Sequence, residues 1–282
     1  MTICVAAIAE VFEEEPRIVF CADRMISGRV QFELGNPKIF RLNDYCLVMM
    51  AGNPLKGGQI ISKVQERLLD EDLVTNEIVK IVSEEYRNTM NETNEQRILS
   101  PKKLTIKKFY SQLNKFPKEF AEDIDEQLKE DPFDLSFLVC GIDNSEAHLF
   151  EVVSKGEIND YSSLGFAAIG SGAPQSIAEL GKYQYGSNIS LSHAIHLTYL
   201  AKKEAQRVGG IGVETDLGVL HVVDDKTTLW MADNDFVSML DEQISKLKGY
   251  ETQLQKETEI VISEKLYKQN KEDMKNIENK VE

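Results

Sequence analysis

Five residues of the chain have types and settings that could together activate a hydroxyl as a nucleophile. Thr2 carries a hydroxyl, and its α-amine becomes free if Met1 is removed. A free α-amine has a pKa of about 7.7–8.0, so it can accept a proton from its own hydroxyl near neutral pH. The other four supply an acid, a lysine, a backbone donor and a second hydroxyl: Asp23, Lys38, Gly52 and Ser171. This set predicts a threonine nucleophile that carries its own base.

The supporting residues stand where strands are expected to end and turns to begin. Asp23 follows an apolar run, and it could hold Lys38 charged beside the Thr2 amine. A nearby cation lowers the pKa of that amine and keeps it unprotonated. Gly52 ends a buried strand, and its N–H could donate to an oxyanion while its missing side chain leaves room for substrate. Ser171 lies between two glycines and could orient the amine or a water.

Each of these residues also has a purely structural interpretation. Thr2 is only the first strand residue if Met1 is retained, and a retained Met1 blocks the mechanism. Asp23 can pair with a neighbouring arginine, and Lys38 can be a surface lysine. The glycine-containing turns can reverse the chain or cap a helix without any catalysis. Only the ordered combination of the residues favours the chemical interpretation.

The periodicity of the apolar residues predicts the elements that must position these groups. Strands are expected over residues 3–52, helices over 58–130, and strands again over 135–170. Two helices follow at 173–183 and 192–206, then a hairpin at 217–231 and a charged helical tail at 235–282. Strands grouped in this way and separated by helices indicate antiparallel sheets covered by helices, an α+β protein. Thr75 and Ser192 are the expected helix N-caps, residues 88–96 an expected loop or frayed helix end, and 104–120 a lysine-rich helix.

The candidate residues occur in the order found in a known family. The segments are Met1-Thr2, Ala22-Asp23-Arg24, Pro37-Lys38-Ile39, Ala51-Gly52-Asn53 and Ile169-Gly170-Ser171-Gly172. Over about residues 2–232 the sequence resembles the β-type subunits of the proteasome family, within the N-terminal-nucleophile (Ntn) hydrolase superfamily. The resemblance implies a four-layer αββα sandwich of two antiparallel sheets covered by helices. It places this domain at 1–234, with an enlarged helical region near 88–132, and a charged helical extension at 235–282.

The same resemblance implies a function. Thr2 would be the nucleophile of a threonine-type peptidase, with catalytic roles for Asp23, Lys38, Gly52 and Ser171. No cofactor and no metal are implied. The substrates would be peptides or unfolded proteins, and the chain would assemble with its own copies into a ring or stacked rings. An ATP-dependent unfoldase or another protein is a candidate partner, and the tail 235–282 is a candidate contact segment.

One segment departs from the family pattern. The family carries an Asp and then Ser-Gly before the last strands, whereas residues 204–210 read EAQRVGG. Glu204 or Asp216 would have to substitute. This departure, with a retained Met1, supports a second hypothesis: an inactive scaffold or regulatory protein of the same fold. A non-peptide amidohydrolase of the same superfamily is a third.

Composition restricts the remaining possibilities. The 282 residues include 32 Lys+Arg and 47 Asp+Glu, a formal net charge of −15, which argues against binding to nucleic acid or to an anionic membrane. No apolar run reaches the ~20 residues that span a bilayer, and no signal-like segment is seen at the N-terminus. The four cysteines are widely spaced in apolar runs, as expected for buried thiols in a reducing cytoplasm. His193 and His196 lie three apart on a predicted helix, but no further metal ligand follows at the right spacing.

Overall fold

The computed structural model describes most of the chain. The described residues are 2–11, 15–27, 31–33, 38–69, 71, 73–207, 209–223 and 226–281. Contacts between residues divide the chain into two compact units, Met1–Ala232 and Asp233–Glu282. All of the candidate catalytic residues belong to the first unit.

The first sheet contains the start of the chain. Its five strands are antiparallel and are ordered β10 (Phe166–Ile169), β1 (Cys4–Ala9), β2 (Arg17–Asp23), β11 (Thr215–Val223) and β12 (Lys226–Met231). Strand β1 is buried along its whole length. Its small and apolar residues allow other layers to approach both faces of the sheet, as its unbroken apolar run predicts.

The second sheet is also antiparallel. Its strands are ordered β5 (Ile39–Arg41), β6 (Cys46–Gly52), β7 (Leu135–Asp143), β8 (Glu146–Val153) and β9 (Glu157–Asp160). The turn from β7 to β8 has positive φ angles at Asn144 and Ser145, 51° and 61°, as a tight hairpin requires. A separate two-stranded ribbon pairs β3 (Met25–Ser27) with β4 (Gln31–Glu33).

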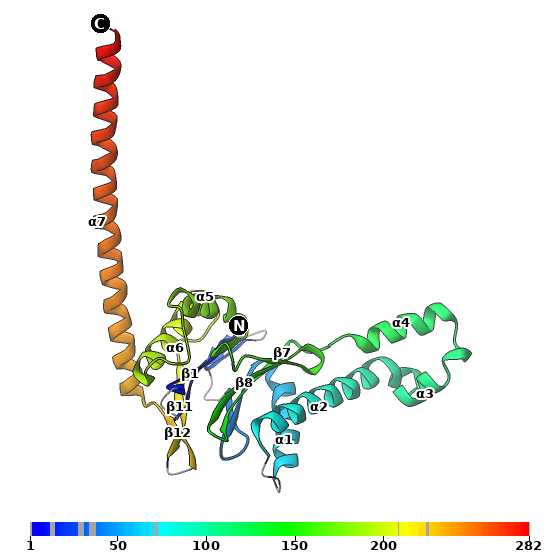
Figure 1. Ribbon diagram of the computed structural model, residues 1–282. Coiled ribbons are helices and arrows are strands. Elements are labelled where there is room, and N and C mark those ends of the chain that lie inside the picture. Colours follow the sequence, from blue (N-terminus) through cyan, green and yellow to red (C-terminus); the bar gives the residue numbers. More distant parts are fainter. Residues whose placement is uncertain are drawn as a thin grey trace. The chain divides into compact units, whose positions relative to one another are not determined.

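The two sheets are stacked between helical layers (Figure 1). Helices α5 (Ala173–Lys182) and α6 (Leu191–Ala205) pack on the first sheet, and α1 (Pro54–Leu68) and α2 (Thr75–Asn94) pack on the second. Alternate residues of the strands fill the space between the sheets, among them Phe20, Met49 and Leu138. The predicted α+β class, with two antiparallel sheets covered by helices, is confirmed.

The helical region between β6 and β7 differs from the expectation. Residues 88–96 are neither a loop nor a frayed end: α2 continues to Asn94 and passes into a π-helical turn at Glu95–Leu99. The expected helix over 104–120 is instead interrupted between α3 (Ile106–Ser111) and α4 (Lys118–Lys129). These short helices enclose a small core of their own, made of Ile98, Leu99, Phe109, Ile124 and Leu128.

Two predicted helix caps are also wrong. Ser190 rather than Ser192 caps α6, because its hydroxyl accepts the N–H of His193. Thr75 is the first residue inside α2, and its hydroxyl bonds the Asp143 carboxylate at 2.5 Å. Thr75 therefore joins the helix to the end of β7.

The second unit is formed by α7 (Asn234–Val281), a single helix of 48 residues. Leu240 and Ile244 are buried, whereas Tyr250 and Leu254 are 71% and 64% exposed. Among the residues that the structure describes, no helix combines the length and the apolar character needed to cross a membrane.

Candidate active site

Asp23 is the centre of the site. It ends β2, is completely buried, and accepts four hydrogen bonds. One oxygen, Oδ1, accepts from Lys38 Nζ at 2.7 Å and from the Ile3 N–H at 2.9 Å. The other, Oδ2, accepts from the N–H groups of Gly212 at 3.0 Å and Met25 at 3.2 Å. A buried carboxylate is tolerated only with such a complete set of donors, and the set fixes the direction of its oxygens.

Lys38 connects this carboxylate to the hydroxyl of Thr2. Its side chain is 7% exposed, and its Nζ lies 2.7 Å from Asp23 Oδ1 and 2.9 Å from Thr2 Oγ1. Its backbone carbonyl accepts the Met50 N–H of β6 at 3.0 Å, which places the lysine against the second sheet. The lysine therefore crosses from one sheet to the other and ends at the nucleophilic oxygen.

The backbone of Thr2 is held by the turn that follows β10. The Thr2 nitrogen donates to Ser171 Oγ at 3.1 Å, and the Thr2 carbonyl accepts from the Gly172 N–H at 3.2 Å. In the printed sequence this nitrogen is the amide that joins Met1, a residue outside the described part of the chain. After removal of Met1 the same nitrogen is the α-amine, beside the Ser171 hydroxyl.

Gly170 is required for this close approach. Its φ is +96°, and a Cβ at this position would lie 2.4 Å from the Thr2 carbonyl oxygen and 3.3 Å from the Ala51 methyl. Both the backbone conformation and the space therefore exclude a side chain. The turn can hold Thr2 only because this residue is a glycine.

Gly52 is the last residue of β6. N–H groups alternate in direction along a strand, so the Gly52 N–H points to the same side of β6 as the Met50 N–H, which reaches Lys38. The reason for the glycine differs from the expected one. Its φ is +109°, and a Cβ would lie 1.8 Å from the Asp134 carbonyl oxygen, so the missing side chain accommodates the chain before β7 rather than substrate.

The two acids considered as substitutes for the missing Asp have other partners. Glu204 forms an ion pair with Arg207 at 2.8 Å, and Asp216 forms one with Arg24 at 2.6 Å. The segment before β11 contributes the Gly212 N–H to Asp23 instead. No local pattern in the sequence predicts this contact, which joins residues 189 positions apart.

The four cysteines are buried and free, as the sequence predicts. Burial raises the pKa of every thiol, that of Cys21 to about 12. The thiols are therefore protonated at neutral pH and are poor nucleophiles, including Cys4, whose Sγ approaches the Met50 carbonyl at 3.5 Å. Within the described ranges, no three His, Cys, Asp or Glu side chains are grouped so that they could hold a metal ion.

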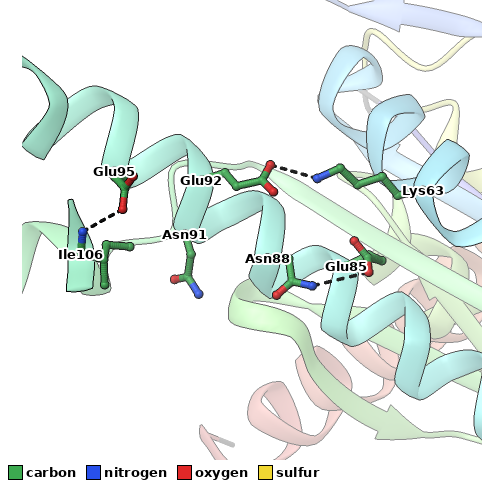
Figure 2. A pocket seen from close by; sticks show the side chains of 7 residues that line it. All are labelled: Lys63, Glu85, Asn88, Asn91, Glu92, Glu95 and Ile106. Carbon is green, nitrogen blue, oxygen red and sulfur yellow. Dashed lines mark hydrogen bonds and ion pairs between the residues drawn. The ribbon is translucent and has the colours of Figure 1, made fainter. Parts of the chain in front are cut away.

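An open pocket of about 370 Å³ lies elsewhere and is lined mainly by residues of α2 (Figure 2). Its polar groups largely bond one another: Lys63 pairs with Glu92 at 2.9 Å, and the Ile106 N–H donates to Glu95 at 2.7 Å. It shares no lining residue with the Thr2 site.

Comparison with known proteins finds that part of the chain is similar to proteasome subunits. Residues 114–228 match the family model described as proteasome subunit. Over 188 residues the chain is 26% identical to the protein named proteasome subunit alpha of Methanocaldococcus jannaschii, an alignment that covers 67% of this chain and 59% of that protein. The chain thus aligns with less than two thirds of the relative's length. The matched family region includes Ser171 and Gly212, whereas Thr2, Asp23 and Lys38 precede it.

Proposed function

We propose that the chain is a proteasome-like threonine peptidase of the β type, which hydrolyses peptide bonds with Thr2 after Met1 has been removed. One observation carries the proposal: Lys38 Nζ hydrogen-bonds both Thr2 Oγ1 and the buried Asp23 carboxylate. Lys38 is not a surface lysine, because its side chain is only 7% exposed and is fixed between these two groups. The arrangement is what an N-terminal threonine needs to become a nucleophile.

In the first half of the reaction, Thr2 Oγ1 attacks the carbonyl carbon of the scissile bond. Its proton passes to the free α-amine, which the Ser171 hydroxyl holds in place. The Lys38 ammonium donates to Oγ1 and stabilises the negative charge that develops on this oxygen. The Gly52 N–H donates to the oxyanion of the tetrahedral intermediate.

The intermediate then breaks down to an ester. The protonated α-amine gives its proton to the leaving nitrogen, the carbon–nitrogen bond breaks, and the acyl group remains on Thr2 Oγ1. In the second half a water molecule loses a proton to the amine and attacks the ester carbonyl. The acid product leaves, and the hydroxyl and the amine of Thr2 are regenerated.

We infer that the active form is a homo-oligomer, a ring or stacked rings, in the cytoplasm. Residues 114–228 match a family of subunits. Leu247, Leu254 and Val261 recur at intervals of seven along α7, and the last two are 64% and 54% exposed. Such a spacing suits packing between helices of different copies. Substrates would be peptides or unfolded proteins, delivered by an unfoldase or another protein partner.

A non-catalytic scaffold of the same fold is the second candidate. It is favoured by residues 204–210, which lack the expected Asp, and by the ion pairs of Glu204 and Asp216 with arginines. In this case Met1 would stay in place and the Thr2 nitrogen would remain an amide. The hydrogen bonds of Asp23 would then have only a structural role.

Two measurements on the purified full-length protein separate these functions. Intact mass shows whether Met1 is removed, and an electrophilic probe for N-terminal threonine then reports on Thr2. We expect loss of Met1 and one probe adduct on Thr2, which Thr2→Ala abolishes and Ser192→Ala, a matched change of an exposed hydroxyl, preserves.

Retention of Met1 in every oligomeric fraction, measured by light scattering and mass together, would reject the peptidase and favour the scaffold. A labelled Thr2 without turnover of any peptide in a mixed peptide library would favour the non-peptide amidohydrolase.

A further inference from the structure

A lysine that the proposed reaction does not use lies fully buried in α6. Lys202 is 0% exposed. Its Nζ donates to the carbonyl oxygens of Gly212 and Val213, each at 3.0 Å, and to the Thr215 hydroxyl at 2.5 Å. An ammonium group has three donors, and three acceptors surround it here. Burial of a cation at this position is tolerated because all of them are used.

The same stretch of chain is held by the next turn of the helix. Gln206 Nε2 donates to the Gly212 carbonyl at 2.6 Å. Lys202 and Gln206 are four residues apart, so they share one face of α6. That face binds the Gly212 loop, defined here as residues 209–214, through the carbonyls of Gly212 and Val213.

The amide group of Gly212 reaches the candidate active site. The Gly212 N–H donates to Asp23 Oδ2 at 3.0 Å. Asp23 Oδ1 accepts from Lys38, which donates to Thr2 Oγ1. One residue therefore receives hydrogen bonds from the helix on its carbonyl and gives one to the carboxylate from its amide.

A second contact links the loop to the nucleophile. Ile211 is buried, and a Cβ on Gly172 would lie 2.5 Å from its Cδ1. The Gly172 N–H holds the Thr2 carbonyl. A displaced Gly212 loop would thus disturb Thr2 through its backbone as well as through Asp23.

An apolar side chain of similar length would fill the volume of Lys202 but would remove the charged donor from the Gly212 and Val213 carbonyls and leave each with only a neutral one, from Gln206 and from Thr215. The ammonium group is therefore needed for the position of the loop rather than for packing alone.

We propose that Lys202 is a positioning residue for the Thr2 site: it holds Gly212 so that the Gly212 N–H fixes Asp23, which keeps Lys38 against the Thr2 hydroxyl. This inference rests on the proposed function. In this chain, the segment before β11 would support the Thr2 site through the Gly212 N–H, although it lacks the Asp that the family pattern has there. Lys202 acts through Gly212, Asp23 and Lys38 and touches no reacting atom.

The test uses the full-length protein with Lys202→Met, Lys202→Arg and the matched control Lys203→Met, one position along the same helix. Amide hydrogen exchange reports on the peptide that covers residues 209–214. The rate of Thr2 labelling, measured over a range of probe concentrations, gives a maximal rate and a half-saturating concentration.

We expect Lys202→Met to speed exchange in the loop and to lower the maximal labelling rate about tenfold or more, with the half-saturating concentration within about twofold. Lys202→Arg should restore part of the rate because it keeps the charge and the donors. Lys203→Met should match the unchanged protein in both measurements.

A folded Lys202→Met protein with unchanged labelling, or with unchanged exchange in the loop, would overturn the inference. If this variant does not fold, Gln206→Ala replaces it, since Gln206 is only partly buried. A smaller effect in the same direction supports the inference, and no effect rejects it. If the unchanged protein is never labelled, the proposed function fails and the role of Lys202 in catalysis falls with it, while the exchange data still show whether Lys202 holds the loop.

Discussion

Replacement of Lys38 by methionine separates the stability of the site from its chemistry. The lysine is 7% exposed and is the charged partner of a carboxylate that is 0% exposed. Removal of one partner from a buried pair costs about 3–5 kcal/mol, because the remaining charge stays uncompensated. Asp23 keeps three backbone donors, from Ile3, Met25 and Gly212. We therefore expect a loss near the lower end, about 3 kcal/mol in the free energy of unfolding.

The loss of activity has a different origin. Lys38→Met removes a charged donor from Thr2 Oγ1, and such hydrogen bonds contribute about 1.5–3 kcal/mol. At about 1.36 kcal/mol for each factor of ten, Thr2 labelling should fall by about 10- to 160-fold. The variant with both Lys38→Met and Asp23→Asn removes the buried charge together with its partner. It should regain only part of the stability, because the Asn amide nitrogen cannot accept the backbone N–H groups that one Asp23 oxygen now binds, and none of the labelling rate.

Urea unfolding and the labelling rate of the same preparations give the two quantities. Lys107→Met, on the exposed side of α3, is the matched control and should leave both unchanged. The reasoning is refuted if Lys38→Met labels within about threefold of the unchanged protein. It is refuted equally if the double variant is no more stable than Lys38→Met, because the cost would then not come from an unpaired carboxylate.

Two further predictions concern the backbone and the thiols. Gly170→Ala should abolish Thr2 labelling and lower the free energy of unfolding by about 1–3 kcal/mol, since φ is +96° and the new methyl would meet the Thr2 carbonyl. Gly181→Ala, where a Cβ meets nothing within 4 Å, is the control, and equal urea midpoints for the two variants would contradict this account. Burial raises the pKa of the four thiols, which belong to Cys4, Cys21, Cys46 and Cys140. Iodoacetamide at pH 8 should therefore modify none of them in the folded protein and all of them after unfolding in urea, as measured by intact mass. Rapid modification of the folded protein would contradict this prediction, because it would show that the thiols are accessible.

Much of the candidate site could be predicted because its residues stand where local patterns change. Asp23 and Gly52 each end an apolar run, and such runs were expected to be strands. Ser171 lies in a glycine turn between a strand and a helix. These signals are local, so the sequence is enough to place them at the ends of strands, where side chains from different strands can meet.

Other features depend on contacts that no local pattern contains. Lys202 and Lys203 are adjacent, and in a helix the directions of successive side chains differ by about 100°. The way α6 packs on the sheet therefore buries Lys202 but not Lys203, and the sequence alone does not show which lysine is buried. The bond from Gly212 to Asp23 joins residues 189 apart. Residues 88–96 are mostly polar, so their composition does not predict a helix. The buried side of α2 includes Tyr86, Met90 and Asn94, which are spaced four residues apart.

The wide separation of the groups around Thr2 has a consequence for the timing of synthesis. Lys38 lies 36 residues from Thr2, Ser171 lies 169 residues from it, and Gly212 lies 189 residues beyond Asp23. Removal of Met1 from a growing chain would expose the amine long before the ribosome has added the turn that holds it. A nascent chain that has reached β6 contains Thr2, Asp23 and Lys38, but it lacks both the Ser171 hydroxyl and the Gly212 amide. Under the proposed function, the site would therefore stay incomplete during translation, until the segments that contain Ser171 and Gly212 have been added.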